Sequence, residues 1–165
     1  MADESRRPGV ARLTWIAILL FVAVQANADK EPLSKTVIGP SNLYLKEGAD
    51  ALLMGDSDEG VRLTALGLKR AAGRREKKMG HANLCAGFLL LDQPDTALEH
   101  CNWVLQRYPS HWRTYNNRAL VYLRLRRFED SQADILKGQE LNPRSRKLKE
   151  VQGLYFEAVD SGDEE

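Results

Sequence analysis

The stretch from Trp112 to Pro143 decides the fold, and it reads WRTYNNRALVYLRLRRFEDSQADILKGQELNP. Its first half places four residues on one helical face at the spacing i, i+4, i+7 and i+8: Tyr115, Ala119, Tyr122 and Leu123. After a basic break, the second half continues a helical spacing with Phe128, Ser131, Ile135 and Gly138. Pro143 ends the second helix, because proline lacks an N–H and keeps the preceding residue out of the helical conformation. The stretch therefore predicts a helical hairpin in which Ala119 and Ser131 let two backbones approach closely.

This pattern resembles the tetratricopeptide (TPR) repeat, a helical hairpin of about 34 residues. A second copy begins at Lys78 and aligns without a gap; its matching residues are Cys85, Phe88, Ala97, Cys101 and Pro109. A poorer third copy begins at Ser41, three residues out of phase with the others. A basic linker at residues 73–77 accounts for this offset. The matching residues of that copy are Tyr44, Gly48, Ala51, Gly60 and Gly67. Together with its N-terminal segment, the chain resembles an exported bacterial TPR-repeat protein.

The resemblance implies an all-α fold, a short right-handed α-solenoid of three TPR-like hairpins plus a C-terminal capping helix. The hairpins are expected at residues 41–74, 78–111 and 112–145, within a domain that spans 41–159. The capping helix is expected at 146–159, where a helical spacing joins Leu148, Val151, Tyr155 and Val159. Residues 160–165 are acidic and are expected to form a disordered tail.

Capping residues predict where the individual helices begin and end. Ser41 is expected to cap the first helix and Asp58 the second, which Gly73 then ends. In the second hairpin, Asp95 or Thr96 is expected to start the second helix.

The first 28 residues have the pattern of a secretory signal peptide. Arg6, Arg7 and Arg12 precede an apolar run at residues 13–24, and an Ala-Asn-Ala end follows. The run is shorter than the roughly 20 residues that span hydrocarbon. Cleavage after residue 28 would leave a flexible lead-in at 29–40 and a periplasmic or secreted protein. A membrane-tethered scaffold that retains the segment is an alternative.

Charge argues against one class of partner. The whole chain carries a formal net charge of +1, and 21 basic and 21 acidic residues remain once the first 28 residues are removed. Binding of nucleic acid through a global positive field is therefore not supported. The length of 165 residues suffices for a single domain with its own core.

The two cysteines fall in one hairpin. Cys85 lies at the small-residue position of the first helix, and Cys101 faces it from the second helix. An even number of cysteines in an exported chain favours a disulfide between them. The alternative is that both are small core residues, since free cysteine is among the most buried residue types.

Other chemistry has little support in the sequence. His81 lies one helical turn before Cys85, and with Cys101 it could form three ligands of a metal site, but no fourth ligand is evident. We therefore expect no metal and no cofactor, and we read His100 and His111 as surface or loop residues. No nucleophile–base signature, phosphate-binding loop or paired-carboxylate arrangement is present, so no catalytic residue is predicted.

The TPR resemblance implies a concave groove lined by the first helix of each hairpin, which holds an extended or helical peptide. The residues carried over to this groove are Lys46, Asn83, Leu89, Arg113, Asn116, Asn117, Leu120 and Arg124. Asparagine amides can bond a peptide backbone, and the arginines can bind a carboxylate through paired N–H groups. The match to the carboxylate clamp of this family is incomplete. Asn117 and Arg113 fit in kind, but Ala82 and Ala86 stand where the clamp has lysine and asparagine.

The sequence thus predicts an exported, non-catalytic protein–protein interaction module that binds a peptide segment of a partner. One alternative is a thiol-dependent redox factor that uses Cys85 and Cys101. Its support is weak, because the Cys-x-x-Cys spacing of such proteins is absent.

Overall fold

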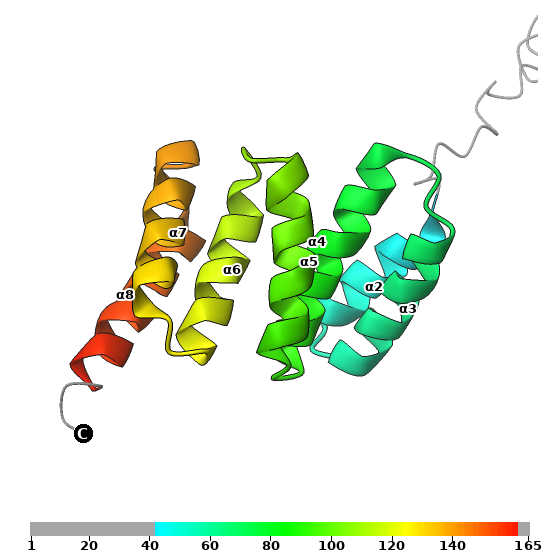
Figure 1. The fold of residues 1–165 in the computed structure, drawn as a ribbon. Helices are drawn as coiled ribbons and strands as arrows, with labels where there is room; N and C mark the ends of the chain where they lie inside the picture. Colours follow the sequence, from blue (N-terminus) through cyan, green and yellow to red (C-terminus); the bar gives the residue numbers. More distant parts are fainter. Residues whose placement is uncertain (1–41, 162–165) are drawn as a thin grey trace, which may run out of the picture. The chain divides into compact units, whose positions relative to one another are not determined.

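The computed structural model describes residues 42–161, which contain seven α-helices and no strand (Figure 1). The helices are α2 (Leu43–Leu53), α3 (Ser57–Lys69), α4 (Arg74–Leu90), α5 (Pro94–Arg107), α6 (Trp112–Arg124), α7 (Phe128–Leu141) and α8 (Arg146–Asp160). The all-α prediction is confirmed. The predicted signal peptide, the lead-in and all but the start of the acidic tail lie outside the described residues, and Asp160 is the last residue of α8.

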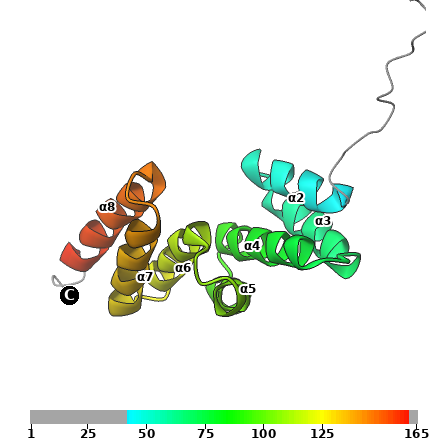
Figure 2. The ribbon, with the colours of Figure 1, turned by 90° about the horizontal axis from the view of Figure 1, so that it is seen from above.

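The helices form three hairpins, α2 with α3, α4 with α5 and α6 with α7, and α8 packs against the last of them. The first helices of successive hairpins also contact one another, α2 with α4, α4 with α6 and α6 with α8. Figure 2 shows these first helices on the inner side of a curved row, with α5 and α7 on the outer side. The described residues therefore form an α-solenoid with a continuous inner wall.

Small residues mark the line where the two helices of each hairpin meet. Cys85 and Ala119 on the first helices are fully buried, and so are Ala97 and Ser131 on the second helices. In the third hairpin the Ser131 hydroxyl donates to the Ala119 carbonyl oxygen over 3.0 Å. That distance requires small side chains on both helices, as the sequence pattern predicted.

The capping helix closes the core at its C-terminal end. Leu148 and Val151 of α8 are buried, and Val151 packs with Ala119 and Ile135. Gly138 of α7 makes room for this contact, because a Cβ placed on it would lie 2.6 Å from Cδ2 of Leu148. The α8 helix thus covers apolar surface that would otherwise meet water.

Several predicted helix ends are wrong by a few residues. The α3 helix begins at Ser57, because the side chain of Asp56, not Asp58, accepts the N–H of Glu59 over 3.2 Å. It ends at Lys69, and Gly73 instead precedes α4, so the predicted linker at 73–77 is helical from residue 74 onward.

Two further boundaries concern caps. Ser41 lies outside the described residues, and Asn42 caps α2 by accepting the N–H of Leu45 over 3.4 Å. The α5 helix begins at Pro94, ahead of the predicted Asp95 or Thr96. Proline is suited to the first helical position, because the N–H group that it lacks would have no partner within the helix there.

Candidate functional site

The inner wall carries a hollow between α4 and the start of α6, which we call the inner hollow. Its volume is about 240 Å³. The residues that line it are Lys78, Met79, Ala82, Asn83, Ala86, His111, Arg113, Thr114 and Asn117. Ala82 and Ala86 contribute short apolar side chains to this lining. The lining contains two permanent cations, two amides and no carboxylate.

Burial lowers the pKa of His111, and the nearby charges of Lys78 and Arg113 lower it further. The histidine is therefore neutral near pH 7. Its Nδ1 lies 2.7 Å from the hydroxyl of the buried Thr114, which fixes the start of α6. The positive charge of the inner hollow thus comes from Lys78 and Arg113, and this charge favours an anionic group.

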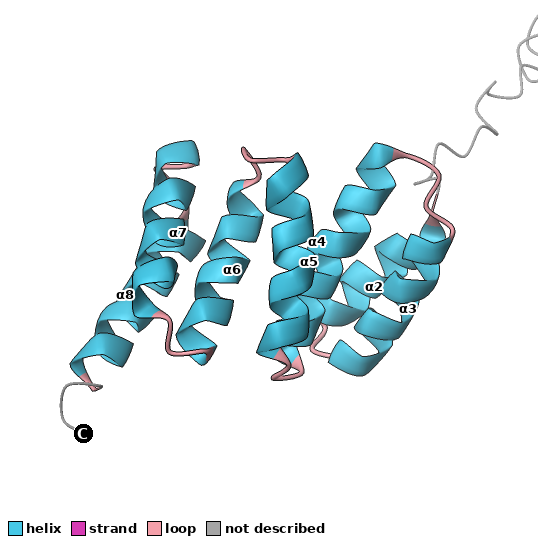
Figure 3. Cartoon of the chain, in the orientation of Figure 1, coloured by secondary structure: helices cyan, strands magenta, loops and turns pink. Residues whose placement is uncertain are grey.

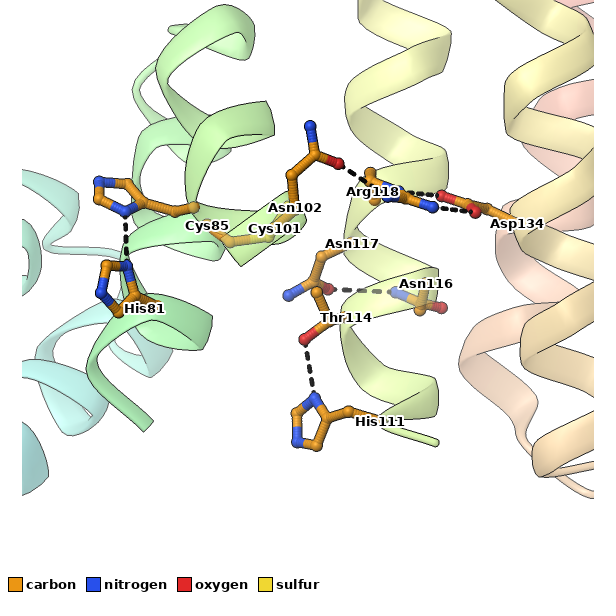
Figure 4. Close-up of a disulfide and its surroundings, with 11 residues drawn as sticks. His81, Cys85, Cys101, Asn102, His111, Thr114, Asn116, Asn117, Arg118 and Asp134 are labelled. Atoms are coloured by element: carbon orange, nitrogen blue, oxygen red, sulfur yellow. Dashed lines mark hydrogen bonds and ion pairs between the residues drawn. A yellow bond between two sulfur atoms is a disulfide. The ribbon is translucent and has the colours of Figure 1, made fainter. Parts of the chain in front are cut away.

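Amide groups give the inner hollow its donors and acceptors. Asn83 donates from Nδ2 to the Leu45 carbonyl oxygen over 3.2 Å, which joins α4 to α2 and leaves its Oδ1 as an acceptor. Asn117 accepts from Nδ2 of Asn116 over 3.3 Å (Figure 4), so its own amide N–H groups remain available as donors. Asn116 is buried, and its Oδ1 has no hydrogen-bond partner among the described residues.

A second hollow, which we call the leucine hollow, lies farther along the same two helices. Its volume is about 260 Å³, and it is lined by Leu89, Leu90, Asp92, Leu120 and Arg124. Arg124 and Asp92 form a loose ion pair of 3.7 Å between exposed side chains. Arg113 and Leu120 are seven residues apart on α6, which corresponds to about 10 Å along the helix.

The structure therefore brings six of the eight sequence-predicted groove residues to two neighbouring hollows: Asn83, Arg113 and Asn117 in the first, Leu89, Leu120 and Arg124 in the second. Lys46 lines neither hollow and instead forms an ion pair of 2.6 Å with Asp50. Asn116 is placed behind Asn117 rather than on the open surface. A peptide-binding role of these residues stays a prediction.

His81 and Cys85 lie on α4, and Cys101 lies on α5, the second helix of the same hairpin. Cys85 and Cys101 form a disulfide that joins α4 to α5, with Cα atoms 5.1 Å apart, and both are fully buried. The sulfurs are therefore not available as thiolate ligands beside His81.

His111 lies in the loop just before α6, as expected, whereas the expectation that His100 is a surface or loop residue is wrong. His100 is half-buried, and its Nδ1 lies 3.0 Å from Nδ1 of His81. The His81 ring also stacks on Trp103 at 3.8 Å. Burial, together with His100 and Arg107, lowers the pKa of His81 to about 4. His81 stands at the position that Tyr44 and Tyr115 occupy in the other two hairpins, which is a packing position, but no sequence signal pairs the two histidines.

A polar network that the sequence did not predict links three helices (Figure 4). Arg118 of α6 donates from Nε and Nη2 to both carboxylate oxygens of Asp134 on α7, over 2.6 and 2.7 Å. Its Nη1 donates to Oδ1 of Asn102 on α5 over 2.7 Å. The guanidinium therefore holds the second and third hairpins together.

Comparison with known proteins supports the fold. No family model matches the chain. It is 36% identical over 81 residues to the human "FK506-binding protein-like" protein, an alignment that covers 49% of this chain and 23% of that protein. The chain thus spans about a quarter of the length of this relative.

Two solved TPR domains resemble the structure. The first TPR domain of human RPAP3 has a TM-score of 0.64 at 17% identity, with 74% of this chain and 94% of that chain covered. The first TPR of Spaghetti (RPAP3), solved bound to the HSP90 peptide SRMEEVD, has a TM-score of 0.62 at 17% identity, with 72% and 91% covered. These likenesses establish the TPR-domain fold for the described residues.

Proposed function

We propose that this chain is a non-catalytic peptide-binding module whose inner wall holds an extended, acidic segment of a partner protein. The observation that carries the proposal is the lining of the inner hollow. Lys78 and Arg113 supply positive charge, Asn83 and Asn117 supply amide groups, and no lining residue is acidic. A carboxylate that enters this hollow would find complementary charge and paired N–H donors.

The leucine hollow extends the same surface. An extended peptide rises about 3.3 Å per residue, so one anchored near Arg113 reaches the level of Leu120 after about three residues. There Leu89 and Leu120 can contact an apolar side chain. The peptide in the Spaghetti complex, SRMEEVD, combines acidic and apolar residues and is a suitable first ligand.

Binding of this kind requires little rearrangement. The bond of Asn83 to the Leu45 carbonyl and that of His111 to Thr114 fix side chains of the hollow before a ligand arrives. A preformed site loses less conformational entropy on binding. We propose that the protein acts by capture and retention of its partner.

The test is a titration of fluorescent SRMEEVD into the protein, followed by anisotropy. The variant Arg113→Ala/Asn117→Ala should bind about tenfold or more weakly, because it removes charge-assisted bonds. Arg62→Ala, on the outer helix α3 and paired with Glu59 over 2.6 Å, is the matched control and should bind like the wild type. Equal affinities for all three proteins would refute the groove assignment.

We further propose that the chain is exported. The basic start, short apolar run and Ala-Asn-Ala end of the first 28 residues support this, and a disulfide persists best in an oxidising compartment. Among the described residues no helix combines the length and apolarity that a membrane crossing needs. N-terminal sequencing of the mature protein should read from Asp29. An intact N-terminus in a membrane fraction would instead support the tethered alternative.

A redox role for Cys85 and Cys101 has less support than peptide binding, because their sulfurs form a disulfide and both residues are buried. Alkylation of the folded protein without reductant should label no thiol. Turnover of a disulfide substrate would reverse this preference.

A further inference from the structure

A third hollow lies outside the inner wall, where α4 begins and α5 ends, and we call it the edge hollow. Its volume is about 510 Å³, about twice that of either inner-wall hollow, and it is lined by Arg74, Lys77, Trp103, Arg107 and Tyr108. Figure 3 shows that the loops before α4 and after α5 lie at the same edge of the described residues. The antiparallel pairing of α4 and α5 thus brings basic residues from both helix ends to one place.

The edge hollow has an excess of positive charge. Its lining contains three permanent cations and no carboxylate. The ion pairs found between described residues involve none of Arg74, Lys77 and Arg107. The two nearby histidines add no charge near pH 7, because burial lowers the pKa of His81 to about 4 and also lowers that of His100.

Aromatic contacts hold two of these residues in position. The Arg107 guanidinium lies 4.4 Å from the centre of the Trp103 ring, and its Nη1 donates to the Trp103 carbonyl oxygen over 3.3 Å. Because a guanidinium has five N–H donors, four remain for a ligand. The Tyr108 hydroxyl donates to the Arg74 carbonyl oxygen over 3.1 Å, which ties the first turn of α4 to the end of α5.

The start of α4 adds further donors. Gly73 precedes the helix and offers no side-chain cap to its first N–H groups. The backbone N–H groups of Arg74 and Arg75, at the positive end of a helix of 17 residues, reinforce the attraction of the three side chains for an anion. The Glu76 carboxylate of the same turn accepts the Ala72 N–H over 3.0 Å. The proposal depends mainly on the three cationic side chains, and the helix N–H groups only add to their attraction.

We propose that the edge hollow binds a phosphate monoester. A phosphate monoester carries close to two negative charges and three acceptor oxygens, which matches three cations that line one hollow better than a single carboxylate does. The ligand is a phosphorylated side chain or a small phosphate compound. The Trp103 ring already stacks on His81 and contacts the Arg107 guanidinium, so a nucleobase would have to compete with these groups to stack on it.

Nuclear magnetic resonance of the indole N–H groups tests the proposal at the site itself. The chain has three tryptophans, and comparison with Trp112→Phe and Trp103→Phe assigns the Trp103 signal. The probes are a short phosphoserine peptide, its unphosphorylated form, AMP and inorganic phosphate. We expect a saturable shift of the Trp103 signal with a phosphate-bearing probe and none with the unphosphorylated peptide.

Two variants distinguish specific binding in the edge hollow from nonspecific attraction of an anion to a basic surface. Arg74→Gln/Arg107→Gln should weaken binding about tenfold or more, as expected from loss of charge-assisted bonds. Arg75→Gln removes a charge from the same turn of α4 at an exposed residue that does not line the hollow, and it should change affinity less than twofold.

Three results would overturn the proposal: no saturable shift with any phosphate probe, an equal response to the unphosphorylated peptide, or an equal loss in Arg75→Gln. Preference for the phosphopeptide over AMP and inorganic phosphate would identify a protein ligand, and the reverse order a small molecule. The double variant should retain its affinity for SRMEEVD, which shows that it is folded and that the two sites are independent.

Discussion

At the scale of single residues, Asp134 illustrates how burial raises the energetic importance of an ion pair. Its carboxylate is nearly inaccessible to water and is held by two bonds from Arg118. Asp134→Asn leaves the Arg118 guanidinium without its counter-charge, and we expect the free energy of unfolding to fall by about 3–5 kcal/mol. Urea denaturation measures the change.

The surface pair of Arg127 and Asp130 is the control for that experiment. Its atoms are equally close, at 2.6 Å, but about half of each side chain is exposed. Asp130→Asn should therefore change stability by no more than about 1 kcal/mol. Similar losses in the two variants would mean that burial of the Arg118 pair contributes nothing.

His81 makes stability depend on pH. Its pKa is about 4 in the folded chain and 6.5 in the unfolded one, so between these values the unfolded chain binds a proton that the folded chain does not. Stability should therefore fall as the pH is lowered from about 6.5 to about 4. Urea midpoints measured across this range should fall less steeply in His81→Tyr, which introduces the residue found at the matching position of the other hairpins. If the urea midpoint depended on pH in the same way in the wild type and in His81→Tyr, His81 would not be the source of the pH dependence.

At the scale of elements, close approach of two helices is set by glycine in the first hairpin. A Cβ on Gly48 would lie 2.8 Å from the backbone nitrogen of Thr64, and a backbone atom cannot rotate away. Gly48→Ala should therefore separate α2 from α3 and destabilise the protein by about 1–3 kcal/mol.

Gly153 provides the opposite case with the same substitution. No atom lies within 4 Å of a Cβ placed there, on the exposed middle of α8. Gly153→Ala should stabilise by about 0.5–1 kcal/mol, because alanine loses less entropy in a helix. Thermal denaturation of Gly48→Ala and Gly153→Ala measures both changes in stability. If both substitutions stabilised the protein, or both destabilised it, the packing argument would be refuted.

The disulfide stabilises the second hairpin as an element. Cys85 and Cys101 are 16 residues apart, and closure of a loop of this size contributes about 3 kcal/mol in the chain-entropy treatment. Unfolding in the presence of dithiothreitol should show this loss. The double variant Cys85→Ala/Cys101→Ala should not respond to the reductant, and a response would point to another cause.

At the scale of the whole molecule, α8 determines whether the last hairpin remains folded. Removal of the chain after Ser145 takes away Leu148 and Val151, which are buried, and uncovers Ala119 and Ile135. Loss of each large side chain from the core should cost about 1.5–3 kcal/mol. We expect a lower urea midpoint and binding of a hydrophobic dye.

The control retains α8 and changes only its outer surface. Leu154 and Phe156 are exposed, so Leu154→Ser/Phe156→Ser should leave the urea midpoint unchanged. If the shortened chain unfolded at the wild-type midpoint, the capping role of α8 would be ruled out.

The sequence by itself determined the hairpins. Helical spacing, a terminating proline and small residues such as Cys85 and Ala119 act within one or two turns, and those signals are local. The TPR resemblance also predicted that Arg113 and Asn117 line the inner wall, where the inner hollow is found. Helix ends were less certain, because Asp56 and Asp58 are both competent caps and only the fold selects one.

Only the tertiary structure decided which side chains meet across helices. The pairing of His81 with His100, the bridge from Arg118 to Asp134 and the edge hollow all join residues from different helices. Such contacts depend on how far the helices approach and at what angle they cross, which packing of the complete core determines. The periodicity of one helix carries no information about the rotation of its neighbour.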